Sequence, residues 1–122
     1  MVYSGDGIKK LIADGKLEVS PNPEIKEASI KIHFAEKMIL RPKEFRIAKS
    51  LETMELSIDI AGLYDGYTHL SRRGIITHLG SMFVDPGSEG QITFECFNAS
   101  DSEVTVEAGE RAGHLVILQV GE

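Results

Sequence analysis

Short segments in which apolar and polar residues alternate, separated by closely spaced turn signals, make up most of this 122-residue chain. The alternation is clearest in residues 29–34, 45–48 and 104–106. Proline, glycine and asparagine recur between such segments, as in Pro21-Asn22-Pro23 and Tyr64-Asp65-Gly66. Many short strands at this spacing favour an antiparallel sandwich or barrel over an α/β fold, so the predicted fold class is all-β.

One short helix is expected near the N-terminus. The apolar residues of this segment follow helical spacing, and Asp6 before them can accept orphan backbone N–H groups as the N-cap. Gly15 tolerates the left-handed conformation that ends helices. The pattern predicts a helix over about residues 6–14.

Length and composition favour one domain. A chain of 122 residues with 42% hydrophobic residues can bury one core but hardly two, so we expect a single domain over residues 1–122, β-rich over 17–120. Residues 114–120 form a nearly continuous apolar run, which predicts a strand buried on both faces or covered by another subunit. Oligomerisation follows as a hypothesis, because such a strand would otherwise be a sticky edge.

The charge balance restricts the partners. Thirteen basic against nineteen acidic side chains give a formal net charge of -6, which repels DNA and anionic bilayers, so neither nucleic acid nor a membrane is expected as a partner. The Arg72-Arg73 pair is either a local positive site for a small anionic nucleotide or two solvated arginines. The single Cys96 excludes an intrachain disulfide, and no signal peptide or membrane span is visible, so we expect a cytoplasmic protein.

The segment from Gln91 to Phe97 alternates as a strand and carries a carboxylate. Its alternation puts Phe94 and Cys96 on one face and Thr93 and Glu95 on the other. If the second face is covered, desolvation raises the pKa of Glu95 and suits it to proton transfer near neutral pH. If that face is exposed, Glu95 is an ordinary solvated glutamate.

Three segments with fixed spacing follow one another between residues 67 and 95. They are the loop 67–75, the sequence Val84-Asp85-Pro86-Gly87, and Glu95, ten residues after Asp85. This pattern resembles the nucleotide-binding core of the dCTP deaminase and dUTPase superfamily, most closely its dCTP deaminase branch. The resemblance implies a dUTPase-like β-barrel or sandwich and a homotrimer with sites for dCTP or dUTP between subunits.

The resemblance also implies roles for two carboxylates. Glu95 lies 23 residues after Arg72, the family's spacing for the general acid/base that moves a proton from water to the departing ammonia without zinc. Asp85 matches the aspartate that contacts the deoxyribose or, in dUTPases, activates the attacking water. Asp-Pro-Gly is also good turn chemistry, and a purely structural Asp85 is the alternative.

The loop resembles the family's phosphate-binding turn with two changes. Thr68 keeps a hydroxyl for phosphate or the catalytic water, and Arg72 matches the distal arginine of the family. Tyr67 stands where the family has an arginine or lysine, and His69 replaces a serine. Loss of a charged phosphate donor is worth about 1.5 to 3 kcal/mol, so triphosphate affinity is expected to suffer.

Two further positions complete the implied nucleotide site. His78 aligns with a histidine of the segment in which backbone atoms read the base edge, and Ser81 replaces a small alanine there. No metal bound by the protein is expected, because His33, His69, His78 and His114 lack metal-ligand spacing. Mg²⁺ would arrive with the nucleotide's phosphates.

The C-terminus departs from the family. The sequence stops at Glu122, without the tail that closes over the triphosphate, which predicts weak binding, slow turnover or no turnover. The function expected first is zinc-independent deamination of dCTP to dUTP. The alternatives are dUTP pyrophosphatase activity and a non-catalytic trimeric relative that binds a nucleotide or a protein.

Overall fold

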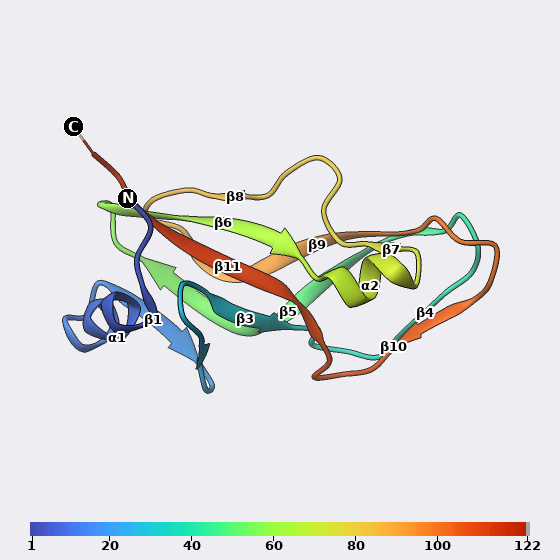
Figure 1. Cartoon of the computed structure of the whole chain (residues 1–122), viewed down its shortest axis with the longest axis horizontal. Coiled ribbons are helices and arrows are strands. Elements are labelled where there is room, and N and C mark those ends of the chain that lie inside the picture. Colours follow the sequence, from blue (N-terminus) through green and yellow to red (C-terminus); the bar gives the residue numbers. More distant parts are fainter. Residues whose placement is uncertain (122) are drawn as a thin grey trace.

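The computed structural model describes residues 1–121, which fold into antiparallel sheets with two short helices (Figure 1). The helices are α1 (Gly5–Ala13) and α2 (Thr68–Arg72). The strands are β1 (Leu17–Ser20), β2 (Glu24–Ile25), β3 (Ile30–His33), β4 (Met38–Leu40), β5 (Phe45–Leu56), β6 (Ile60–Gly66), β7 (Ile75–Ile76), β8 (Phe83–Val84), β9 (Glu89–Asn98), β10 (Val104–Val106) and β11 (Arg111–Gln119). The all-β prediction is confirmed.

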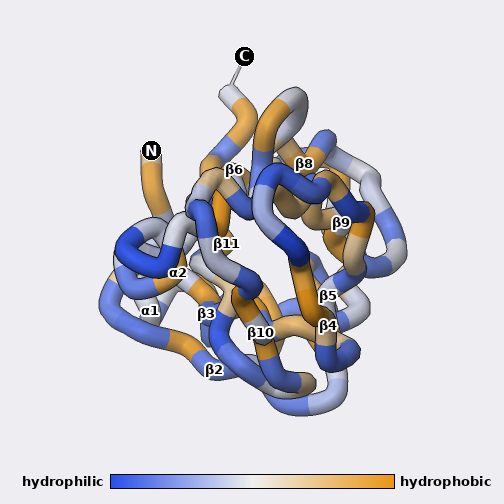
Figure 2. The backbone as a smooth tube through the Cα atoms, turned by 90° about the vertical axis from the view of Figure 1, so that its right-hand side faces the viewer, coloured by the Kyte–Doolittle hydropathy of each residue, from blue (hydrophilic) through white to orange (hydrophobic). Residues whose placement is uncertain are grey.

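Two larger sheets enclose the core. One has the strand order β2-β3-β11-β6-β8 and the other β1-β5-β9-β7, while β10 pairs with β4 in a small third sheet. Tyr64 of β6 and Phe94 of β9 meet between the larger sheets with their ring centroids 5.3 Å apart. Figure 2 shows hydrophobic residues along strands such as β4 and hydrophilic residues along many of the connections. Because successive side chains of a strand point to opposite faces, the alternation in the sequence gives each sheet one face toward the core and one toward solvent.

The C-terminal strand β11 lies in the middle of the five-stranded sheet, between β3 and β6. Leu115 and Ile117 are fully buried on one face, whereas His114 and Val116 on the other face are only half-buried. The sequence predicted that this strand is buried on both faces or covered by another subunit, and within the chain one face of β11 is fully buried. The two chain ends meet at this strand, because Val2 forms a bridge with Leu118.

The N-terminal helix α1 begins earlier than the sequence suggested. Its N-cap is Ser4, whose hydroxyl accepts a hydrogen bond of 3.1 Å from the Gly7 N–H, so the assignment of Asp6 as cap was wrong. A serine hydroxyl three residues before an orphan N–H satisfies it as well as a carboxylate does. Gly15 follows the C-cap Asp14 with φ of +73°, in the left-handed conformation expected of it.

The second helix, α2, was not predicted. It occupies the middle of the loop that was expected to be a phosphate-binding turn, and it is anchored by the buried Leu70. Gly74 leaves it with φ of +85°, and an added side chain there would collide with Ser100. No helix within residues 1–121 is long and apolar enough to cross a membrane.

A register shift in β5 brings polar groups into the core. The pairing of β5 with β9 is interrupted between Lys49 and Thr53, as at a β-bulge. Both Ser50 and Glu52 are buried there, at 0% and 1% exposure. The Ser50 hydroxyl accepts the Ile92 N–H at 2.8 Å, so the interrupted ladder still satisfies its backbone. Glu52 thereby becomes a carboxylate inside the protein.

Candidate functional site

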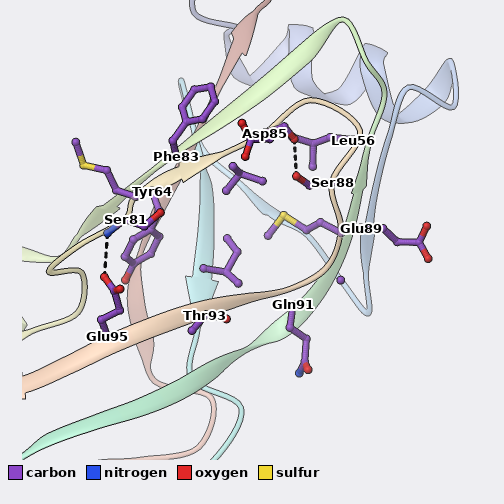
Figure 3. A pocket seen from close by; sticks show the side chains of 15 residues that line it. Leu56, Tyr64, Ser81, Phe83, Asp85, Ser88, Glu89, Gln91, Thr93 and Glu95 are labelled. Carbon is purple, nitrogen blue, oxygen red and sulfur yellow. Dashed lines mark hydrogen bonds between the residues drawn. The ribbon is translucent and has the colours of Figure 1, made fainter.

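A cavity of about 330 Å³ opens between β8, the turn that follows it, and β9. Figure 3 shows its walls, with Glu95 toward one end and Asp85 toward the other. The lining residues are Met54, Leu56, Tyr64, Ser81, Met82, Phe83, Val84, Asp85, Ser88, Glu89, Gly90, Gln91, Ile92, Thr93 and Glu95. An apolar wall with a few polar groups at its ends is typical of a small-molecule site.

Glu95 is held by backbone groups. Its Oε1 accepts N–H groups from Leu79, Gly80 and Ser81 at 2.9, 2.7 and 3.1 Å, whereas Oε2 takes part in none of these bonds. These donors, with Gly80 contributing most, hold the pKa of Glu95 below its usual range and outweigh the opposing effect of burial. The condition for a raised pKa is therefore not met, because the outer face of β9 is only half-covered. Glu95 is thus an ionised carboxylate whose Oε2 has no hydrogen-bond partner in residues 1–121.

Asp85 closes the turn after β8 and also borders the cavity. Its carbonyl accepts the N–H of Ser88 at 3.1 Å and the hydroxyl of Ser88 at 2.5 Å, which closes the turn. Gly87 has φ of +79°, the conformation that a Pro-Gly turn of type II requires. The Asp85 side chain remains exposed at the edge of the cavity. It can therefore hold the turn through its backbone and contact a ligand through its carboxylate.

Tyr64 forms the inner wall of the cavity. Its hydroxyl donates to Thr77 Oγ1 or the Ala112 carbonyl, both at 2.9 Å, and burial raises its pKa well above the usual range. The edge of its ring contacts His78, with ring centroids 5.6 Å apart, and His78 Nε2 lies 3.7 Å from Asp65 Oδ1. His78 thus lies behind the wall, packed on a rigid tyrosine, and does not itself line the cavity.

The loop residues form a separate group around Tyr67. The Tyr67 ring meets the rings of His69 and His114 edge-on, each with centroids 5.0 Å apart, and its hydroxyl accepts Arg111 Nη1 at 3.2 Å. Thr68 is exposed on α2. His69 Nε2 also lies 3.3 Å from Glu110 Oε2. Tyr67 is the centre of this group.

The two neighbouring arginines behave differently. Arg73 donates to Glu110 at 2.6 Å and to the Thr105 carbonyl, so it ties α2 to the sheet. Arg72 is exposed and forms no ion pair with any residue in 1–121. Arg73 is therefore structural, which neither interpretation of the Arg72-Arg73 pair anticipated, whereas Arg72 is exposed.

The predicted site residues therefore fall into two groups. Ser81, Asp85 and Glu95 share the cavity, whereas Tyr67 and His69 contact each other beside β11. None of the hydrogen bonds, ion pairs and ring contacts within residues 1–121 joins a cavity residue directly to the loop residues 67–72.

Sequence reasoning missed a chain of side chains that leads to Tyr67. The buried Glu52 accepts the His33 backbone N–H at 3.0 Å and lies 2.5 Å from His33 Nδ1. His33 Nε2 lies 2.9 Å from Glu24 Oε1, and both oxygens of Glu24 accept hydrogen bonds from Arg111. The Arg111 guanidinium, and after it His33, hold the pKa of Glu24 below its usual range against desolvation. Arg111 then donates to the Tyr67 hydroxyl.

One signal in the sequence could have located this chain. Glu52 is in phase with Met54 and Leu56 on β5, so an acidic residue occupies the register of the buried face. A charge in that register requires a partner, because an unpaired buried carboxylate is costly. The identity of the partners, His33 and beyond it Glu24, was not readable from spacing.

A second contact supports the other side of Tyr67. Lys31 Nζ donates to His114 Nδ1 at 2.7 Å and lies 5.1 Å from the centroid of the Tyr67 ring. Burial first, and then the neighbouring Lys31, lower the pKa of His114. His114 is therefore neutral, with its proton on Nε2. Within residues 1–121, no group of three or more histidine, cysteine, aspartate or glutamate side chains is arranged to hold a metal ion.

Solved structures define the fold class. The chain matches the dUTPase of Staphylococcus bacteriophage 80alpha, solved as its G164S mutant with dUpNHpp, with a TM-score of 0.74 and 20% identity over 87% of this chain and 83% of that one. The EIAV dUTPase matches with a TM-score of 0.71 and 18% identity, covering 84% of this chain and 88% of that one. The protein has a dUTPase-like fold.

Sequence comparison identifies the family. The family described as dCTP deaminase-like matches residues 22–120, and the chain belongs to it. A dUMP-forming dCTP deaminase of Mycobacterium sp. (strain KMS) is 38% identical over 85 residues, 70% of this chain and 45% of that protein. The corresponding protein of Corynebacterium glutamicum (strain R) is 34% identical over 91 residues, 75% of this chain and 48% of the relative. The chain spans about half the length of the curated relatives it matches.

Proposed function

We propose that the chain is a hydrolase of the dCTP deaminase type, acting on pyrimidine deoxynucleotides without zinc. The observation that carries the proposal is Glu95, which lines the cavity with Oε1 fixed by three backbone N–H groups and with Oε2 unpartnered among residues 1–121. A cavity of about 330 Å³ is within the usual range for small ligands and is compatible with a pyrimidine and its sugar.

In the proposed reaction, Glu95 moves one proton. Its free oxygen takes a proton from water as the water oxygen bonds to C4 of cytosine, and the same carboxyl then protonates the departing amino group, which leaves as ammonia. In the free chain the pKa of Glu95 is low, which makes it a weak base. A cytosine ring that fills the cavity would exclude water and raise the basicity of the Glu95 carboxylate. Asp85 would hold the deoxyribose from the far end of the cavity.

The phosphates are assigned to the loop. Thr68 and Arg72 would orient the phosphates and the water, with Tyr67 and His69 beside them and Mg²⁺ arriving on the nucleotide. His78 and Ser81 would position the backbone that reads the base. Because no hydrogen bond, ion pair or ring contact in the part of the chain that the structure describes joins the loop to the cavity, we propose that a homotrimer joins the loop of one copy to the cavity of the next.

An exposed apolar strip supports this assembly. Phe45 and Ile76 flank Phe97 in adjacent strands and are 54% and 38% exposed, and Ile47 beyond them is 52% exposed. Apolar side chains gathered in this way on one sheet face favour burial against another copy. Sedimentation of the purified chain as a stable monomer would contradict the shared site.

Two other functions remain as alternatives. Removal of diphosphate from dUTP is favoured by the likeness of the fold to dUTPases, and the relatives named dUMP-forming would combine it with deamination. A non-catalytic binding protein is favoured by Tyr67, which places no cation at the loop position where phosphate is expected.

Product analysis distinguishes the three. Purified protein with Mg²⁺ would be incubated separately with dCTP and dUTP, and the products separated by chromatography. We expect a uridine nucleotide from dCTP, and its loss in Glu95→Gln, which keeps the size of the side chain but cannot accept the proton. Monophosphate from dUTP would assign pyrophosphohydrolysis, and no product from either nucleotide at high protein concentration would assign a binding protein.

A further inference from the structure

Arg111 occupies the place where the loop lacks a cation. Its Nη1 donates to the Tyr67 hydroxyl at 3.2 Å, so a guanidinium lies at the tip of the residue that replaces the expected arginine or lysine. Arg111 lies on β11, 44 residues after Tyr67 in the sequence, and it brings a positive charge to the position where the loop lacks one.

The guanidinium has donors left for a ligand. Its three contacts, two with Glu24 and one with Tyr67, use three of the five N–H groups that an arginine carries, which leaves two. The side chain is 39% exposed, so these donors can reach solvent. A guanidinium with free N–H groups suits the oxygens of a phosphate better than a single ammonium does.

The orientation of Arg111 is fixed from the protein interior. Glu24 grips it through both carboxylate oxygens, His33 connects Glu24 to Glu52, and Glu52 is 1% exposed. Both ring nitrogens of His33 face carboxylate oxygens, at 2.9 Å from Glu24 and 2.5 Å from Glu52, so the imidazole is held from both sides. A cation held in this way loses little freedom when an anion binds.

The charges nearby favour an anion. Glu24 is matched by Arg111, His33 and Lys26, the last at 3.7 Å. On the other side of Tyr67, Lys31 is held by the neutral His114 and has no acidic partner in residues 1–121. Glu110, the other acidic group beside the loop, is paired with Arg73 and His69, and Asp65 faces His78. Lys31 is therefore a cation beside Tyr67 that no carboxylate within residues 1–121 pairs with.

We infer that Arg111, with Lys31 and the Tyr67 hydroxyl, forms an anion site that takes the phosphate chain of the nucleotide, and that Glu24, His33 and Glu52 are its positioning residues. The inference deepens the proposed function, since it names the group that binds phosphate at a loop without its own cation at position 67. It predicts that affinity for polyphosphate depends on Arg111 whether or not a base is attached.

Titration calorimetry with inorganic tripolyphosphate and Mg²⁺ tests the site on the full chain. The wild type should bind, and Arg111→Met should bind about tenfold or more weakly, because one charged hydrogen-bonding group is lost. Arg41→Met is the matched control, since Arg41 is an exposed arginine that pairs with Glu44 and forms no ion pair with the residues around Tyr67 in the part of the chain that the structure describes, and the affinity of this variant should stay within twofold of the wild type. Wild-type protein that does not bind tripolyphosphate, or an Arg111→Met affinity within twofold of the wild type, would overturn the inference.

A rescue experiment sets this role apart from a structural one. Returning a cation to the loop with Tyr67→Arg in the Arg111→Met background should regain most of the lost affinity, whereas failure to regain any in a folded double variant counts against the site. Circular dichroism and the melting temperature check folding, and Arg111→Lys, which keeps the charge, should bind more tightly than Arg111→Met.

The positioning residues have a separate readout. Glu52→Gln keeps the size of the side chain and should weaken tripolyphosphate binding several-fold without changing the affinity for deoxycytidine, which has no phosphate. Equal weakening of both ligands would mean general loosening and would reject the positioning role. If tripolyphosphate binding depends on Arg111 but Glu95→Gln retains turnover, only the proposed reaction fails.

Discussion

The cavity and the loop around Tyr67 hold their charged groups by opposite means. In the cavity, Glu95 is fixed by three backbone N–H groups from one short segment, residues 79–81. Beside the loop, Arg111 is fixed by side chains that follow one another through Glu24 and His33 to the buried Glu52. Backbone donors survive almost any substitution, whereas a chain of side chains can be broken at each member. The cavity is therefore robust to mutation and the loop side is fragile.

The largest expected effect is on the fragile side. Glu52→Ala removes the acceptor of both the His33 backbone N–H and its ring, and breaking a buried charge pair costs about 3 to 5 kcal/mol in the free energy of unfolding. Urea denaturation measures this loss. Glu103→Ala, which changes an exposed glutamate, should stay within about 0.5 kcal/mol of the wild type. A loss below about 1 kcal/mol for Glu52→Ala would show that Glu52 does not hold this series of side chains in place.

A smaller effect is expected from pH at His114. Burial and Lys31 lower its pKa in the folded chain from an ordinary value of 6.5, so below that pH the unfolded chain takes up the proton more readily. The stability that the folded chain gains by keeping His114 neutral is therefore present above about pH 6.5 and is lost as the pH falls. His114→Gln keeps an acceptor for Lys31 and cannot be protonated.

The measurement is the drop in melting temperature between pH 7.5 and 5.5, which should be smaller in His114→Gln than in the wild type. Equal drops in the two proteins would show that His114 is not held neutral. Because His114 packs on Tyr67, the result also tests how firmly the residues around Tyr67 are held.

The smallest effect is expected on the robust side. NMR titration of the Glu95 carboxyl should give a pKa below the ordinary glutamate value of 4.5, since Leu79, Gly80 and Ser81 donate to the ionised form. Ser81→Ala keeps the backbone N–H and should leave that pKa unchanged. A Glu95 pKa at or above the ordinary value, or one that rises in Ser81→Ala, would mean that the backbone does not hold the carboxylate.

The same difference explains what could be predicted from the sequence. The strands follow from local alternation, and Asp85 and Glu95 were singled out because they match a family pattern whose two carboxylates lie ten residues apart, on the turn after β8 and on β9. Arg111 could not be found in this way, because its partners Glu24 and Tyr67 are 87 and 44 residues distant in the chain. Such contacts depend on the order of strands in the sheet, which a single sequence does not state.

Two local misses have local causes. The helix α2 has no polar side-chain cap, since Tyr67 occupies its N-cap, and it is only five residues long, so no start signal or periodicity marked it. The cap of α1 was misplaced because Asp6 and Ser4 are both good N-caps, and only the bond from the Gly7 N–H distinguishes them. The role of each site residue and the single domain stay predictions.

The pairing of the two chain ends gives the molecule a property useful for engineering. Val2 bridges Leu118, the Gln119 N–H donates to the Met1 carbonyl at 3.0 Å, and these paired segments lie on the side away from α2 (Figure 1). A short peptide could therefore join them, and the ring could be reopened at an exposed turn such as residues 100–102. Such a permuted chain would present new ends near the loop, where a reporter domain could sense the occupancy of the phosphate site.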